Sequence, residues 1–81
     1  MTDTVDRRTL EQVPTESIIS SLREDAADDD VSIEAAYPSP DGSQKRMVVS
    51  PRGTVVILND TSEATFNRSQ SAADIAAALR E

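Results

Sequence analysis

The clearest candidates for binding chemistry are three basic residues in the middle of the chain, Lys45, Arg46 and Arg52. No acid lies between residues 43 and 58, so this segment carries a formal charge of +3, whereas the whole chain of 81 residues carries −7. Clustered cations attract phosphate, nucleic acid or an acidic protein surface. The three residues therefore form a candidate anion-binding or partner-binding site. Because the segment has no aromatic side chain for base stacking, ordinary solvated charges that protect a strand edge are the competing interpretation.

Acidic residues are the other group that could do chemistry. Asp28, Asp29 and Asp30 follow one another, and carboxylate oxygens are the ligands that Ca²⁺ or Mg²⁺ prefers. The run lacks the spaced pattern of an EF-hand loop, so a solvated acidic turn is the better interpretation. The chain has no Cys and no His, which excludes thiol and histidine catalysis, disulfides and Cys/His zinc sites. We therefore predict a protein that is not an enzyme and that binds no cofactor and no metal.

The composition indicates a habitat. Arg outnumbers Lys seven to one and Asp outnumbers Glu nine to six. Low Lys, high Asp and strong negative charge are typical of cytoplasmic proteins from salt-accumulating archaea, although an acidic protein from a high-GC bacterium or phage would look similar. No apolar stretch approaches the roughly 18 to 20 residues that cross a bilayer, and the first residues are acidic. These features predict a cytoplasmic protein that does not interact with membranes.

One boundary divides the chain into two parts. Residues 1–12 contain only Val5 and Leu10 as sizeable apolar groups, which predicts a flexible N-terminal tail. Residues 13–81 are then a single small domain. A helix is expected to begin at Pro14 and to end in the acidic run, because negative charges oppose the negative end of a helix.

Three strands are expected to position the basic residues. Apolar residues alternate over 31–37, and further strands are predicted over 44–49 and 54–58, joined by turns rich in Pro, Gly and Asp. Short connections make these strands an antiparallel meander. A polar connection over 59–70 contains Phe66 as a core anchor, and a last helix follows Ser71, which caps it. The predicted fold is α+β, with two layers in the order α-β-β-β-α and a three-stranded antiparallel meander packed against two helices.

Aliphatic residues occur on both sides of this predicted sheet. The helices can cover one face, and Val48, Val56 and Leu58 then form a candidate dimer face on the other. The competing interpretation is that a few exposed aliphatic side chains need no cover.

The predicted element order resembles that of the double-stranded RNA-binding domain. That family contacts RNA phosphates with a lysine cluster at the start of its last helix, where this chain has the run from Ser71 to Asp74. An aspartate there would repel phosphate, so no functional residue is carried over.

Three functions from different classes follow. The first is a non-enzymatic protein-interaction or regulatory module that forms a homodimer through the sheet or through the Ala-rich last helix. The second is a nucleic-acid-associated regulator that uses the three basic residues. The third is an acidic mimic of nucleic acid. We favour the first, because habitat is sufficient to explain the acidity.

Overall fold

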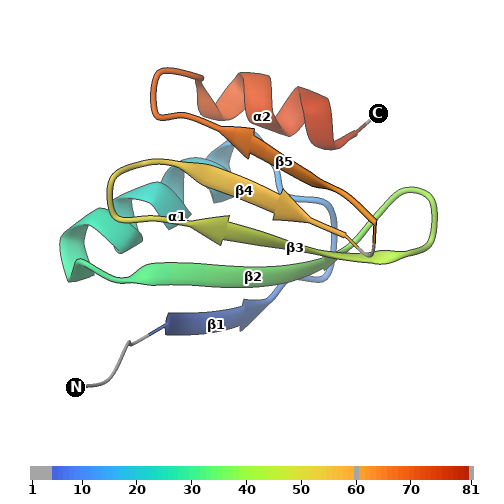
Figure 1. Ribbon diagram of the computed structural model, residues 1–81, viewed down its shortest axis with the longest axis horizontal. Coiled ribbons are helices and arrows are strands. Elements are labelled where there is room, and N and C mark those ends of the chain that lie inside the picture. Colours follow the sequence, from blue (N-terminus) through green and yellow to red (C-terminus); the bar gives the residue numbers. More distant parts are fainter. Residues whose placement is uncertain (1–4, 60, 81) are drawn as a thin grey trace.

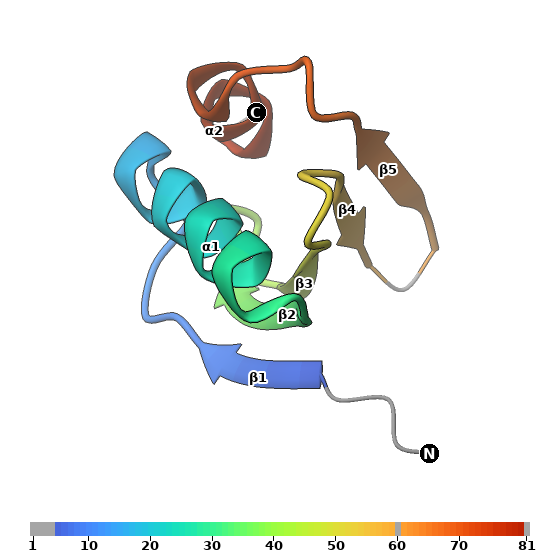
Figure 2. The same ribbon diagram turned by 90° about the vertical axis from the view of Figure 1, so that its left-hand side faces the viewer.

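The computed structural model describes residues 5–59 and 61–80, and in these residues a five-stranded mixed sheet carries two helices (Figure 1). The elements are β1 (Val5–Thr9), α1 (Glu16–Asp29), β2 (Ser32–Pro38), β3 (Gln44–Val49), β4 (Val55–Leu58), β5 (Glu63–Phe66) and α2 (Ala72–Leu79). The strands lie side by side in chain order. Figure 2 shows both helices on the same side of the curved sheet. The predicted α+β class is therefore confirmed.

The central three strands form the predicted antiparallel meander. Val49 of β3 pairs with Ile33 of β2 on one side and with Val55 of β4 on the other. The two turns between these strands also lie where the sequence predicted them. Gly42 and Gly53 occupy them at φ values of 91° and 95°, a conformation that residues with a Cβ rarely adopt.

Two strands extend the meander, one at each edge. β1 pairs with β2 in parallel, and β5 pairs with β4 antiparallel. The prediction of a flexible tail over 1–12 is therefore wrong for Val5–Thr9, and its residues 1–4 lie outside the described residues. The prediction of an irregular connection over 59–70 is likewise wrong for Glu63–Phe66. The three-stranded meander is thus only the centre of the sheet, and the order is β-α-β-β-β-β-α.

Helix α1 begins two residues later than predicted and ends, as predicted, in the acidic run. Its N-cap is Thr15, whose Oγ1 accepts a hydrogen bond from the Ile18 N–H at 3.3 Å. The helix continues through most of the acidic run, because fully buried Ala26 holds this part of it against the core. It ends at Asp30, which adopts the left-handed conformation at φ 54° and donates its N–H to the Ala26 carbonyl. Packing therefore outweighs the unfavourable charges in the last turn.

Helix α2 follows the prediction. The Ser71 Oγ accepts a hydrogen bond from the Asp74 N–H at 3.1 Å, which caps the first turn. From α1, the Arg23 guanidinium donates to the carbonyl oxygens of Gln70 at 2.9 Å and Asn67 at 3.4 Å, so that it fixes the segment that leads into α2. Neither helix in the described part of the chain has the length and apolar character needed to span a bilayer.

The core lies between the helices and the inner face of the sheet. Phe66 packs against it while partly buried, close to its predicted role as an anchor. Alternation along the strands sends every second side chain of β2, β3 and β4 into this layer. The buried apolar side chains are those of Ile19, Leu22, Ala26, Ile33, Ala35, Tyr37, Met47, Val49, Val55, Ile57, Ala72, Ile75, Ala76 and Leu79.

Candidate functional site

The three predicted basic residues do not lie together. Lys45 and Arg46 are neighbours on β3, so their side chains project from opposite faces of the sheet. Arg52 lies in the turn between β3 and β4, at the other end of the hairpin. The prediction that this hairpin forms one basic surface is wrong, because alternation along a strand separates residues that are adjacent in sequence.

The three residues of the predicted dimer face do lie together. They belong to the outer face, which we define as the side chains that the sheet presents away from the helices. Val48 pairs directly with Val56, and Leu58 lies two residues further along β4. The members of the outer face are Val5, Arg7 and Thr9 of β1, Ser32, Glu34 and Ala36 of β2, Arg46 and Val48 of β3, Val56 and Leu58 of β4, and Glu63 and Thr65 of β5.

The aliphatic side chains of the outer face are accessible to a partner. Val48, Val56 and Leu58 are half-buried, whereas the corresponding residues of the inner face are fully buried or nearly so. Val5, on the same face at the edge of the sheet, is 42% exposed and is the one exposed large apolar side chain of residues 5–59 and 61–80. The aliphatic residues at 48, 56 and 58 form a continuous apolar strip across β3 and β4.

Charges on the outer face balance one another. Glu34 lies between two arginines: its Oε1 is 3.7 Å from the Arg7 Nε, and its Oε2 is 4.0 Å from the Arg46 Nη1. Glu63 adds a second acid on β5, beside Leu58. The charged residues assigned to this face are thus two cations and two anions, while the whole chain carries −7.

Comparisons with known proteins give the outer face no counterpart. No protein-family model, curated protein or solved structure matches this chain. Sequence and geometry are therefore the observations that bear on its function.

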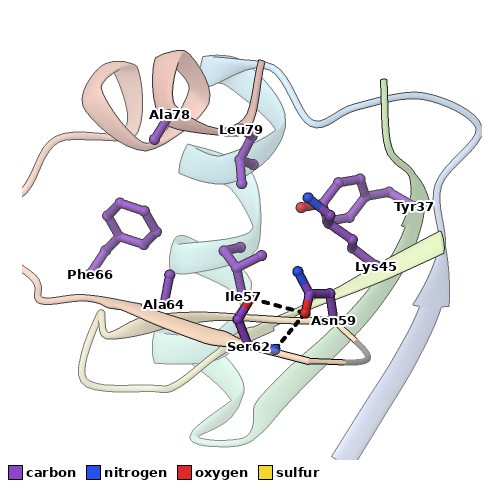
Figure 3. A pocket seen from close by; sticks show the side chains of 9 residues that line it. All are labelled: Tyr37, Lys45, Ile57, Asn59, Ser62, Ala64, Phe66, Ala78 and Leu79. Carbon is purple, nitrogen blue, oxygen red and sulfur yellow. Dashed lines mark hydrogen bonds between the residues drawn. The ribbon is translucent and has the colours of Figure 1, made fainter. Parts of the chain in front are cut away.

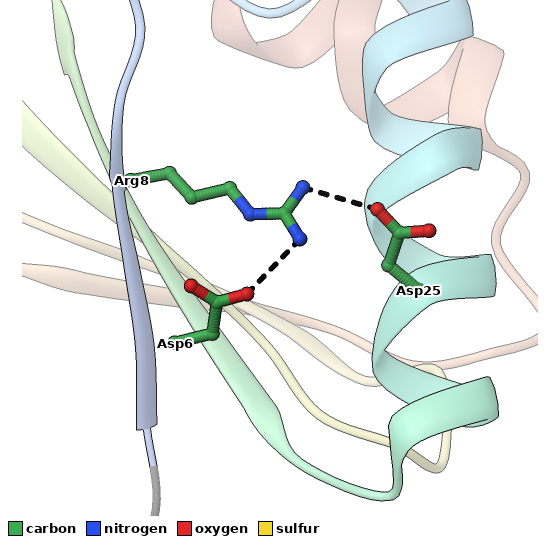
Figure 4. A network of polar contacts seen from close by, with 3 residues as sticks. All are labelled: Asp6, Arg8 and Asp25. Atoms are coloured by element: carbon green, nitrogen blue, oxygen red, sulfur yellow. Dashed lines mark hydrogen bonds and ion pairs between the residues drawn. The ribbon is translucent and has the colours of Figure 1, made fainter.

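An ion-pair cluster holds the edge strand that completes the outer face (Figure 4). The Arg8 guanidinium lies 3.0 Å from the Asp6 Oδ2 on the same strand and 3.0 Å from the Asp25 Oδ2 on α1. Hydrogen bonds to Asp6, which have the larger effect, and to Asp25 raise the pKa of Arg8 above its ordinary value. Because all three side chains are more than a third exposed, the pairs contribute at most about 1 kcal/mol each. They join β1 to α1 and so position Val5 and Arg7.

A cavity of about 240 Å³ lies on the other side of the sheet, between β4, β5 and α2 (Figure 3). Lys45 of β3 lies at this cavity, on the face of the sheet opposite to Arg46. Tyr37 also lines the cavity while only 1% exposed, and desolvation raises the pKa of its hydroxyl, which therefore stays protonated at neutral pH. No local pattern in the sequence indicates this cavity, since its lining comes from five separate segments.

The acidic run shows no metal-binding geometry among the described residues. Asp28 and Asp29 end α1 with their side chains exposed, and Asp30 caps it. Within the described parts of the chain, no three of the metal-ligating residue types come close enough to hold an ion. Mimicry of nucleic acid by these exposed acids stays a prediction.

Proposed function

We propose that this chain is a non-enzymatic protein-interaction module that forms a homodimer through the outer face. The single observation that carries this proposal is an apolar strip, made of Val48, Val56 and Leu58, on the face of the sheet that neither helix covers. A second copy with the same strip is the simplest cover, since two sheets pack face to face through such residues at about 10 Å.

Apolar burial supplies the favourable free energy in this proposal. Removing apolar surface from water contributes about 25 cal/mol per Å², and both copies contribute the same side chains to a two-fold interface. Val48 and Val56 are β-branched residues on neighbouring strands, so they are already fixed in position before association. Little side-chain entropy is therefore lost on binding.

Charge supports a second copy as the partner. Two molecules of net charge −7 repel one another unless they meet through a surface where the charges balance. The outer face is such a surface, because arginine and glutamate alternate across it. In a two-fold arrangement, Arg46 of each copy can face an acid of the other, either Glu34 or Glu63. The face is thus complementary to itself.

The habitat is part of the same proposal. An acidic chain with one lysine suits the cytoplasm of a cell that accumulates salt, where screening weakens the repulsion between two acidic molecules. Apolar association is also stronger when salt is excluded from protein surfaces.

Sedimentation equilibrium of the full chain in high salt tests the dimer. We expect Arg46→Glu to raise the dimer Kd about tenfold or more, because it places like charges opposite one another in both copies. Arg52→Glu is the matched control: it makes the same change of charge in an exposed turn outside the face, and we expect a dimer Kd within about twofold of the original. Circular dichroism checks that both variants fold.

Two results would overturn the proposal as a whole, and a third would move the interface away from the outer face. One is a chain that stays monomeric at every concentration up to the millimolar range. The other is an equal loss of association in the two variants, which would show that the outer face has no special part in it. A dimer that survives Arg46→Glu and dissociates on substitution of exposed alanines of α2 would place the interface on that helix instead.

A further inference from the structure

The cavity beside α2 has one apolar end and one polar end (Figure 3). Its apolar end is formed by Ile57, Phe66 and Leu79, together with two alanines. Its polar end is formed by Tyr37, Lys45, Asn59 and Ser62. A cavity with this division suits a small molecule that has an apolar body and a polar head.

The polar end presents hydrogen-bond donors. The Asn59 Oδ1 accepts hydrogen bonds from the Thr61 N–H at 2.9 Å, the Ser62 N–H at 2.6 Å and the Ser62 hydroxyl at 3.0 Å. The acceptor side of this amide is therefore fully used, and its NH₂ group is left as a donor. The same bonds fix the orientation of the side chain.

Two further donors lie beside this amide. The Tyr37 side chain is 1% exposed, and within residues 5–59 and 61–80 its hydroxyl makes no hydrogen bond to the protein. This hydroxyl is open to the cavity, because the Arg23 Nε is the one fully buried side-chain polar atom of those residues that lacks a partner. No described carboxylate lies within ion-pair distance of Lys45. Figure 3 shows both groups at the same end of the cavity. An ammonium, a phenol and an amide NH₂ together favour an anion, and three donors suit a carboxylate better than a chloride ion because a carboxylate has two acceptor atoms.

We propose that this cavity binds a short apolar monocarboxylate, with its carboxylate at Lys45, Tyr37 and Asn59 and its tail against Ile57, Phe66 and Leu79. The volume sets the size of the ligand. An apolar cavity of about 150 Å³ holds benzene, which has six carbon atoms, so about 240 Å³ suits a ligand of about ten non-hydrogen atoms. Octanoate has that size and is the probe we choose.

Among the described residues, one acid opposes the binding of an anion. Asp41 lines an adjoining hollow together with Lys45, and its carboxylate accepts hydrogen bonds from the Ser43 N–H and hydroxyl. Asparagine can accept the same two bonds without the charge. Asp41→Asn therefore strengthens octanoate binding by a factor of about two to three, since it removes a negative charge near the lysine.

Titration of the ¹⁵N-labelled full chain with octanoate at fixed ionic strength tests the site. We expect saturable amide shifts at Lys45, Asn59 and Ala78, and an affinity for 1-octanol about tenfold weaker. Lys45→Met keeps an unbranched side chain that is one atom shorter, removes the charge and weakens octanoate binding about tenfold. Arg52→Met removes the same charge outside the cavity and leaves the affinity within about twofold.

A second pair of variants tests occupancy of the cavity without any change of charge. Ala78 lines the cavity and Ala77, its neighbour on α2, does not. Ala78→Leu fills the cavity and abolishes the octanoate shifts, whereas Ala77→Leu leaves them. Equal binding of octanoate and octanol, equal loss in Lys45→Met and Arg52→Met, or unsaturable shifts spread over the whole surface would each overturn the proposal. None of these measurements depends on the oligomeric state.

Discussion

At the scale of single residues, the turn between β2 and β3 contains the most perturbed carboxyl group of the described residues. The Asp41 Oδ1 accepts hydrogen bonds from the Ser43 hydroxyl at 2.6 Å and from the Ser43 N–H at 2.9 Å. These bonds stabilise the ionised form, and they lower the pKa of Asp41 from 3.8 to about 2, with the hydroxyl as the largest cause. The charged carboxylate therefore stabilises the folded turn above pH 4, and this contribution is lost as the pH falls toward 2.

Removal of the Ser43 hydroxyl tests this assignment. We expect Ser43→Ala to raise the pKa of Asp41 toward its ordinary value, because only the backbone N–H would then remain as a donor from this residue. A ¹³C carboxyl titration measures the midpoint directly. Ser62→Ala is the control, since its hydroxyl bonds to Asn59 instead, and it should leave the midpoint of Asp41 unchanged. A midpoint near 4 in the unsubstituted chain would contradict the prediction.

At the scale of elements, the end of α1 is set by one residue in an unfavourable conformation. Asp30 adopts φ 54°, which glycine tolerates and a residue with a Cβ resists. We expect Asp30→Gly to raise the free energy of unfolding by about 0.5 to 1 kcal/mol. Asp29→Gly removes the same charge one residue earlier, within the helix, and should instead lower the free energy of unfolding by a few tenths of a kcal/mol.

Urea unfolding of the two variants under the same conditions measures this difference. Removal of an acid from the negative end of the helix stabilises both proteins equally, so the contrast between them isolates the backbone effect. Equal changes in the two variants would show that charge, and not conformation, governs this helix end.

The elements differ in how far the sequence predicts them. The central strands and both helices were predictable, because burial of one face imposes alternation on a strand and a period of 3.6 on a helix. The edge strands were not predictable. On the inner side of β1, Asp6 and Arg8 meet the core layer as paired charges, and in β5 only Phe66 reaches the core. An edge strand that is held mainly by backbone hydrogen bonds needs no alternating apolar residues, so its sequence does not predict it.

The two candidate sites differ in the same way. Alternation alone requires Val48, Val56 and Leu58 to share a face once their strands are paired, so the outer face could be predicted. The same rule places Lys45 and Arg46 on opposite faces, although the two residues are adjacent in sequence. The cavity combines Tyr37 with residues of β4, β5 and α2, and nothing local brings these segments together.

At the scale of the whole molecule, charge is distributed by face. Both helices lie on one side of the sheet, and α1 carries exposed acids there, including Glu24, Asp28 and Asp29. The outer face on the opposite side has balanced charges. In a dimer formed through the outer face, the helices of the two copies point away from each other. The acidic sides of the two copies therefore lie on opposite surfaces of the dimer. Salt should therefore change the free energy of unfolding, through repulsion within one acidic chain, more than it changes the dimer Kd.

The net charge of −7 on a small domain leads to the last prediction. The Debye length is about 3 Å in 1 M salt and about 30 Å in 0.01 M salt, so repulsion among these acids is nearly absent in the first and extends across the molecule in the second. We expect transfer from 2 M KCl to dilute buffer to lower the free energy of unfolding by about 2 kcal/mol, which is about 10 °C in Tm for a domain of this size. Thermal unfolding at protein concentrations below the dimer Kd measures this change without a contribution from association.

Salt also strengthens apolar burial, and the double variant Asp28→Asn, Asp29→Asn separates this effect from repulsion. If repulsion dominates, the Tm of the double variant depends less on salt. If apolar burial dominates, the salt dependence of its Tm is unchanged. A Tm that is equal in 2 M KCl and in dilute buffer would contradict both explanations and, with them, the inference that the composition is an adaptation to salt.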